Sequence, residues 1–155
     1  MEQSPVGQSS PLAQVQEFIM ESMPVAAVAH SFHVDALHDP RFQADPNFQM
    51  FSLIELNELH HQVAAMGSLL RLQMGDRTAL QSLGRNLTGF LANRQLGLQA
   101  AQRLPANIRQ DPRIMTLMQL TEMSNRQVAQ YMPVIAQTVQ QSGAPATGPL
   151  LVDQS

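Results

Sequence analysis

The chain contains no cysteine, no tryptophan and no lysine, so all nine of its Lys and Arg residues are arginines. Without cysteine there is no disulfide framework, no thiolate nucleophile and no zinc–thiolate site. A length of 155 residues leaves room for one domain, and a hydrophobic share of 44% is enough to build a core. We therefore expect one independently folding domain that uses none of the cysteine chemistries.

Charged residues are also scarce, at 14% of the chain. The first 23 residues hold three glutamates and no basic side chain, and the most apolar run covers only residues 24–29. Such a run is far shorter than the roughly 18 residues that cross a bilayer. We expect no signal peptide, no membrane span and a cytoplasmic location.

The charges that are present are unevenly divided. Residues 1–76 hold nine acidic residues and two arginines, a net charge of −7, whereas residues 77–155 hold three acidic residues and seven arginines, a net charge of +4. The two halves should attract each other, within the domain or between subunits. Nucleic-acid binding is disfavoured because the arginines at 77, 85, 94 and 103 lie far apart and do not alternate with aromatic residues that could stack on bases.

Apolar residues recur at helical spacing between two polar ends of the chain. No segment alternates with period two for long enough to indicate a strand. We predict flexible tails at 1–9 and 143–155 and an all-α domain over 10–142. Four amphipathic helices joined by short connections predict an up-down four-helix bundle.

Caps and prolines indicate where these helices begin. Ser10 before Pro11 begins the first helix, and Asp111 before Pro112 begins the last. The tandem Asp-Pro repeat in residues 39–50 predicts one or two short turns.

The second helix is predicted to start at Ser52, because Glu55 three residues later completes a capping box. Gly75 ends this helix at a tight turn, and the third helix follows at about 77–103. The apolar stripes predicted to face the core include Leu12, Val15, Ile19 and Met23 in the first helix, Leu56, Leu59, Val63, Met66 and Leu70 in the second, Leu80, Leu83, Leu87 and Phe90 in the third, and Ile114, Leu117, Val128, Met132 and Ile135 in the fourth.

Proline and glycine inside the helices carry further predictions. Pro24 and Pro133 should kink the two outer helices. Gly84, Gly89 and Gly97 weaken the third helix by about 1 kcal/mol each relative to alanine, a cost that close approach of a neighbouring helix would offset.

All five histidines lie between residues 30 and 61. His30, His33 and His38, with Asp35 nearby, do not share one helix face, because the Asp-Pro step at 39 ends any helix. We expect them at the surface or at helix ends rather than in a metal site.

Glu58 and His61 form a Glu-x-x-His pair, which is typical of di-iron carboxylate bundles. A complete site is missing ligands, because residues 77–110 contain no Asp or Glu and Asn125 stands where a second histidine is needed. The main expectation is therefore no metal, no cofactor and no catalytic residue. The alternative metal-ligand set is Glu17 or Glu21, Glu58, His61 and Glu122.

Ten methionines and, by count, twenty glutamines characterise the rest of the composition. Methionine fills cores adaptably and also lines grooves that accept a partner helix. Glutamine suits an uncharged polar surface packed among copies or partners. No phosphate loop or nucleophile elbow indicates an enzyme.

The segments 55–60 (ELNELH), 75–76, 80–83 (LQSL) and 93–96 (NRQL) together resemble the helical hairpin of small ferritin-like spore-coat proteins, the coat protein F-like group. The resemblance covers residues 53–104. It implies a ferritin-like bundle without an iron centre that serves as a structural component of the coat of bacterial endospores. The lysines common in such proteins are absent here.

Three hypotheses for function follow. The first is a non-catalytic structural or interaction module that assembles with itself or with protein partners, in the cytoplasm or in a spore coat. The second is a metal-binding ferritin-like redox protein that uses Glu58 and His61. The third is an adaptor or secretion-assembly subunit whose methionine-rich stripe binds a partner helix.

Overall fold

The structure is a computed structural model that describes residues 10–144, and this part of the chain forms six α-helices and no strand. The helices are α1 (Pro11–Leu37), α2 (Pro40–Gln43), α3 (Pro46–Gln73), α4 (Ala79–Gln102), α5 (Ala106–Arg109) and α6 (Pro112–Ser142). The all-α prediction is confirmed. Six helices are observed where four were expected, because the one-turn helices α2 and α5 occupy two of the connections. The predicted tails at 1–9 and 145–155 lie outside the described residues.

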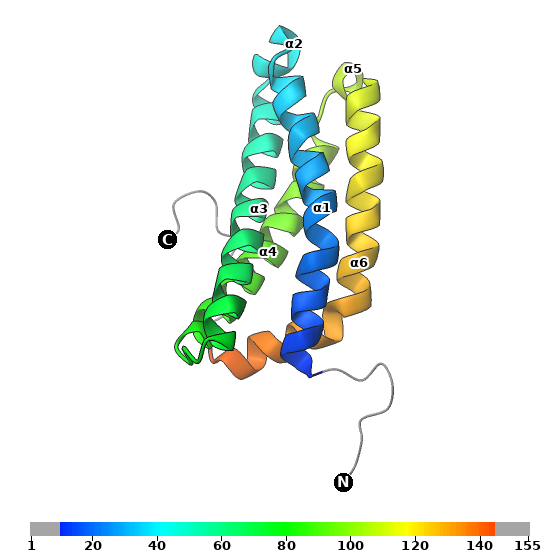
Figure 1. Ribbon diagram of the computed structural model, residues 1–155. Coiled ribbons are helices and arrows are strands. Elements are labelled where there is room, and N and C mark those ends of the chain that lie inside the picture. The colour runs from blue at the N-terminus through cyan, green and yellow to red at the C-terminus, as the bar shows by residue number, and fades with distance from the viewer. Residues whose placement is uncertain (1–9, 145–155) are drawn as a thin grey trace.

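The four long helices run side by side and alternate in direction along the chain (Figure 1). Helix α3 packs most extensively on α4, and α1 packs on α6. The short helices α2 and α5 lie at the same end of the molecule, opposite the α3–α4 turn (Figure 1).

Side-chain caps begin α1 and α6 as predicted. The Ser10 hydroxyl accepts a hydrogen bond from the Ala13 backbone N–H at 3.2 Å. The Asp111 carboxylate accepts one from the Arg113 N–H at 2.9 Å. Each cap is followed by a proline at the first helical position, where the missing N–H leaves no acceptor unsatisfied.

The predicted start of the second long helix at Ser52 is wrong. Helix α3 begins six residues earlier, at Pro46, where the Asp45 carboxylate accepts hydrogen bonds from the two N–H groups of Asn47 and Phe48. The Asp-Pro step nucleates the helix before the capping box is reached. Ser52 and Glu55 therefore lie inside α3 and serve other contacts.

The turn between α3 and α4 agrees with the prediction in its glycine and differs in its length. Gly75 has φ of 96°, in the left-handed region that glycine adopts without strain. The Asp76 carboxylate accepts hydrogen bonds from the Thr78 N–H at 3.1 Å and from its hydroxyl. Helix α4 then begins at Ala79, two residues after the predicted start.

Both internal prolines lie within continuous helices. Helix α6 bends sharply towards its C-terminal end, so that its last turns cross beneath the other helices (Figure 1). This bend agrees with the kink predicted at Pro133, whose ring removes one backbone hydrogen bond. Helix α1 runs through Pro24 without a comparable bend (Figure 1).

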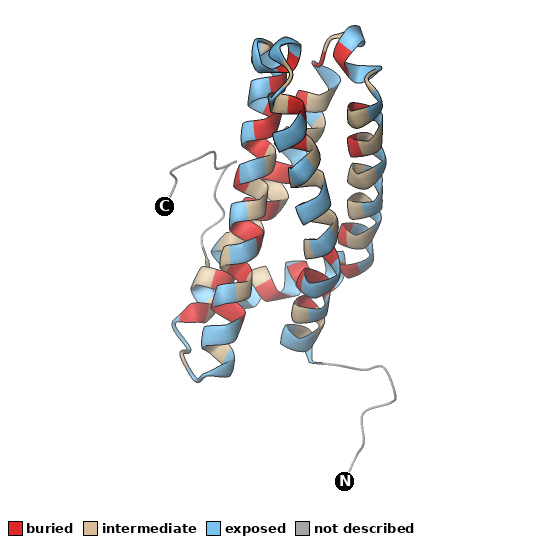
Figure 2. Cartoon of the chain, turned by 45° about the horizontal axis from the view of Figure 1, so that its top comes forward, coloured by how far each residue is buried: buried red, intermediate tan, exposed pale blue. Residues whose placement is uncertain are grey.

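Buried apolar side chains form two clusters, one near the α3–α4 turn and one near the short helices α2 and α5. Figure 2 shows buried residues, in red, along the length of the long helices. The first cluster includes Phe18, Leu69, Leu87, Phe90 and Ile135. The second includes Phe42, Phe48, Ile54, Leu104 and Leu117. On every long helix the two clusters are separated by a central stretch with fewer apolar contacts.

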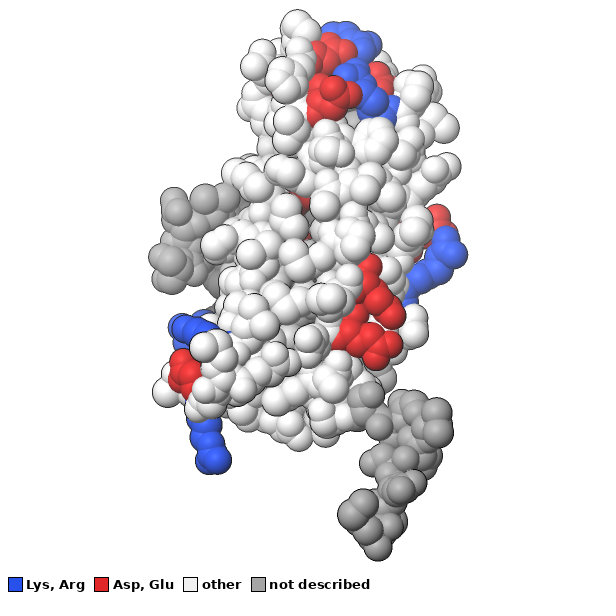
Figure 3. Space-filling model, in the orientation of Figure 1, with Lys and Arg blue, Asp and Glu red and all other residues white. Residues whose placement is uncertain are grey.

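Ion pairs join the first and second halves of the sequence within one chain. Arg113 lies 2.9 Å from Asp39 and 3.0 Å from Asp111, and Arg41 contacts the same two carboxylates. Arg113 also lies over the Phe42 ring, 4.7 Å from its centroid. This group of charges joins α2 to the start of α6 at one end of the molecule (Figure 3).

Candidate functional site

Helix α3 buries polar side chains where an amphipathic helix would bury apolar ones. Half of the buried residues of α3 are polar, namely Ser52, Asn57, His61, Gln62 and Ser68. Burying such groups costs free energy unless each finds a partner.

These buried polar groups are satisfied by side chains of neighbouring helices. The Asn57 amide donates to Asn93 of α4 at 2.9 Å, and the Ser68 hydroxyl donates to Ser82 of α4 at 3.0 Å. The Gln62 amide donates to Ser22 of α1. Helix α3 therefore presents its polar face to α4 and α1.

A further face of α3 is apolar and exposed. Between residues 51 and 70 of the described chain, the exposed residues of α3 lie on one stripe at steps of three and four, which we call the α3 stripe: Leu53, Leu56, His60, Val63, Gly67 and Leu70. Leucine and valine on this stripe are 39% to 51% exposed. The stripe contains no Asp, Glu, Lys or Arg, and most of the face seen in Figure 3 is likewise uncharged.

This arrangement corrects the stripe predicted for the second helix. Leu56, Val63 and Leu70 were expected in the core, and they lie on the surface. The core contacts of α3 come from Phe48, Ile54 and other residues on the adjoining face. The predicted spacing of these apolar residues is correct, but the prediction that they face the core is wrong. Polar groups on α4 and α1 bind other residues of α3, and the apolar row is left on the surface.

The structure does not bring together the alternative metal-ligand set. Glu58 pairs with Arg94, His61 bonds to Asn86 at 3.1 Å, and Glu122 is exposed beside Arg126. Glu21 accepts a hydrogen bond from Tyr131, whose pKa is raised by burial and by the Glu21 and Glu17 carboxylates. In residues 10–144 no group of three or more His, Asp or Glu side chains is placed to hold a metal ion.

The first three histidines occupy different environments. His33 is buried and its Nδ1 lies 2.8 Å from the Ser52 hydroxyl, so the prediction of a surface or helix-end position is wrong for it. Burial lowers the pKa of His33 to about 3, so the ring is neutral near pH 7. His38 is the C-terminal cap of α1, and its Nδ1 lies 2.9 Å from the Val34 carbonyl oxygen, as expected for a helix-end histidine.

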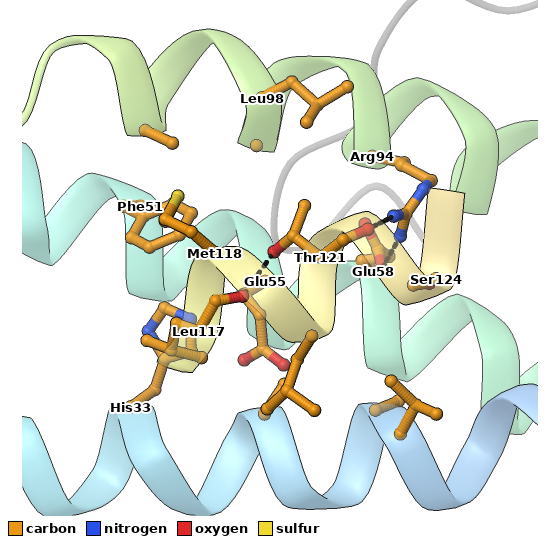
Figure 4. Close-up of a pocket in the computed structure, with 16 residues that line it drawn as sticks. His33, Phe51, Glu55, Glu58, Arg94, Leu98, Leu117, Met118, Thr121 and Ser124 are labelled. Atoms are coloured by element: carbon orange, nitrogen blue, oxygen red, sulfur yellow. Dashed lines mark hydrogen bonds and ion pairs between the residues drawn. The ribbon is translucent and has the colours of Figure 1, made fainter. Parts of the chain in front are cut away.

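A pocket lies beside the second apolar cluster, where α1, α3, α4 and α6 come together (Figure 4). Its volume is about 70 Å3, several times the space that one water molecule needs, and it is partly open to solvent. Much of the lining is apolar, with Val25 and Ala29 from α1, Phe51 from α3, Leu98 from α4, and Leu117 and Met118 from α6.

Two carboxylates one turn apart on α3 enter this pocket. Glu58 turns to Arg94 of α4, with 3.2 Å between the carboxylate oxygen and Nη1, whereas Glu55 extends towards α1 (Figure 4). Burial, and then the nearby Glu58, raise the pKa of Glu55 to about 8. Burial also raises the pKa of Glu58, although Arg94 beside it acts in the opposite direction.

Arg94 holds the pocket wall in place through contacts to α6. Its Nε and Nη2 donate to the Asn125 side-chain oxygen at 2.9 Å and 2.7 Å, and Nη2 also donates to the Thr121 carbonyl at 2.9 Å. Sequence reasoning missed this role of Arg94, assigned Glu55 to a cap and considered Glu58 as a member of the alternative metal-ligand set. The i, i+3 spacing of the two glutamates was the available signal that they share a face.

Comparison with known proteins gives no relative for this chain: it matches no family model, no curated protein and no solved structure. Among the described residues, no helix is both long enough and apolar enough to cross a bilayer. The arguments for function therefore come from the α3 stripe and the central pocket.

Proposed function

We propose that this protein is a non-catalytic structural module that assembles with itself through the α3 stripe. The observation that carries the proposal is the exposed apolar row on α3, which leaves leucine and valine on the surface of a helix that also buries amides and hydroxyls. An exposed apolar row on a folded domain is typical of an interface. The resemblance to ferritin-like spore-coat proteins supports an up-down four-helix bundle that works as an assembled coat component.

The stripe has the spacing of a coiled-coil seam. Leu53, His60 and Gly67 take one position of the heptad, and Leu56, Val63 and Leu70 take the other. Such a seam is completed by a second helix with the same spacing, and the helix available in every solution of this protein is α3 of another copy.

Two α3 helices fit best in antiparallel orientation. A two-fold axis perpendicular to the helices reverses the chain direction, so each residue meets one from the other heptad position. With the axis between His60 and Val63, Leu53 meets the partner's Leu70, and Leu56 meets the partner's Gly67. A Cβ added to Gly67 would meet nothing within 4 Å, so there is space for the leucine.

The absence of cysteine makes a direct test possible. Leu53→Cys and Leu70→Cys each introduce a single thiol on the exposed stripe. A mixture of the two variants should form a disulfide-linked dimer under mild oxidation, whereas each variant alone should not. In the antiparallel pair, two copies of the same thiol are about 25 Å apart, because 17 residues rise about 1.5 Å each.

The possible outcomes separate the arrangements. Self-crosslinking of Leu53→Cys at the rate of the mixture would indicate a parallel pair and overturn the antiparallel arrangement. A wild-type protein that sediments as a monomer up to high micromolar concentration would overturn self-assembly. A monomer would favour the adaptor hypothesis, in which the stripe receives a helix of another protein.

A further inference from the structure

We propose that the central pocket binds a small amphipathic amine, with its ammonium group against the Glu55 carboxylate and its apolar body along α1 and α6. The pocket faces the interior between four helices, whereas the α3 stripe faces outward. The binding site is therefore independent of the self-assembly proposed above.

Glu55 supplies the polar contact that such a ligand needs. Its side chain is 15% exposed, and its Oε2 is a buried atom with no hydrogen-bond partner. The basic group in contact with it is the Nδ1 of His30 on α1, at 3.6 Å. A buried acceptor without a donor is costly, and an ammonium group entering the pocket would supply up to three donors.

The other charges of the pocket favour a cation over an anion. Arg94 does not offer a free nitrogen to a ligand carboxylate, because Nε, Nη1 and Nη2 all donate to protein acceptors. Its charge is balanced by Glu58. His33 is neutral near pH 7. Glu55 is left as the acid of the cavity that has no arginine partner, with His30 as its one basic contact among the described residues.

The apolar lining selects the rest of the ligand. Val25, Ala29, Leu117 and Met118 surround the space next to Glu55 and offer no strong hydrogen-bonding side chain. A straight or branched hydrocarbon of several carbons can enter such a space, and each methylene that it buries adds to the affinity. An amine with a polar body would lose this contribution.

Binding should also release a proton. Burial raises the pKa of Glu55 to about 8, so at pH 7 the empty pocket holds mostly the neutral acid. An arriving ammonium ion stabilises the carboxylate, and the proton leaves to the buffer. Glu58, Arg94, His30 and His33 are the other titratable groups facing Glu55, and α6 adds only the uncharged Thr121 and Ser124. Affinity for an amine should therefore rise as pH increases from about 6 to 9.

Calorimetry of the full chain with hexylamine, hexan-1-ol and hexanoate tests the proposal. These probes share one hydrocarbon body and differ in the charge of the head group. We expect hexylamine to bind at least about tenfold more tightly than hexanol, as for a hydrogen bond between charged groups, and hexanoate to bind most weakly. Glu55→Gln should lower hexylamine affinity to that of hexanol and leave hexanol binding unchanged.

Glu122→Gln is the matched control, because it removes one negative charge at an exposed position outside the pocket. It should leave all three affinities unchanged. Equal binding of hexylamine and hexanol by the wild type, an equal loss in both variants, or no binding of hexylamine would overturn the proposal.

A measurement on the unmodified protein tests the proposal even where Glu55→Gln does not fold. Hexylamine binding at pH 7 should give different heats in phosphate and in Tris, because the released proton is taken up by the buffer. Equal heats after correction for dilution would show that no proton leaves, and this result would also overturn the proposal.

Discussion

The imidazole of His61 on α3 lies directly against the α-carbon of Gly89 on α4. A Cβ added to Gly89 would lie 2.5 Å from the Cε1 of His61, closer than real Cβ atoms approach other heavy atoms. The ring also contacts α4 through Nδ1, which lies 3.1 Å from the Asn86 side-chain oxygen. The two long helices therefore approach closely at a position where only glycine fits.

Gly89→Ala should destabilise the fold even though alanine favours helix. Overpacking costs about 1 to 3 kcal/mol, which exceeds the gain of up to about 1 kcal/mol in helix propensity. Urea unfolding followed by circular dichroism measures the difference. In a His61→Ala background the same substitution should become stabilising, and a loss of equal size in both backgrounds would contradict the proposed contact.

Arg94→Leu should cost about 3 kcal/mol in the free energy of unfolding, because it leaves the Glu58 carboxylate in a buried position without its cation. Glu58→Leu combined with Arg94→Leu should recover much of this loss. Arg126→Leu is the matched control, since the Arg126–Glu122 pair is exposed and should change stability by less than about 1 kcal/mol. Equal losses in Arg94→Leu and Arg126→Leu would exclude a special role of Arg94.

Stability should fall as pH rises from 6.5 to 9. The pKa of Glu55 is raised in the folded state to about 8, whereas in the unfolded chain this group has already lost its proton above its ordinary pKa of 4.5. The stabilisation from the retained proton is complete below pH 4.5 and is lost as pH rises through 8. Glu55→Gln should flatten the urea midpoint over this range, and Glu122→Gln should not. A wild-type midpoint that is constant from pH 6.5 to 9 would contradict this assignment.

Protonation of His33 should lower the stability of the fold as pH falls. Burial lowers its pKa to about 3, while the unfolded chain takes up a proton near the ordinary value of 6.5. Its contribution is lost progressively as pH falls from 6.5 towards 3. The difference in free energy of unfolding between His33→Phe and the wild type should therefore shift in favour of the variant on acidification. A difference independent of pH would show that His33 does not titrate between the two states.

Introducing charged side chains on the α3 stripe should prevent self-assembly and leave folding intact. Leu56→Glu combined with Val63→Glu places two carboxylates on side chains that are 46% and 51% exposed. We expect a monomer by sedimentation velocity whose unfolding free energy stays within about 1 kcal/mol of the wild type at low concentration. Met115→Glu, at an exposed position on α6, is the matched control and should remain assembled. Loss of assembly in the control as well would indicate that the interface lies elsewhere.

The sequence by itself determined the helical class and most of the helix boundaries. The predictions of caps at Ser10 and Asp111 and of a turn glycine at 75 are confirmed. These features depend only on residues a few positions away in the chain, so the local sequence is enough to predict them. Buried positions in α4 and α6 such as Leu87 and Ile135 were also predicted, since apolar spacing marks the core face when the neighbouring helices are apolar.

Only the tertiary structure decided which face of α3 is buried. The apolar row with Leu56 and Val63 and the polar row with Asn57 and His61 have the same helical spacing, and local chemistry favours burying the first. Hydrogen-bonding groups on α4, Asn93 and Asn86, stabilise the second row inside and leave the first on the surface. The Glu58–Arg94 pair and the pocket that it lines also depend on how helices far apart in the sequence are aligned with one another. The spacing of residues within one helix does not determine that alignment.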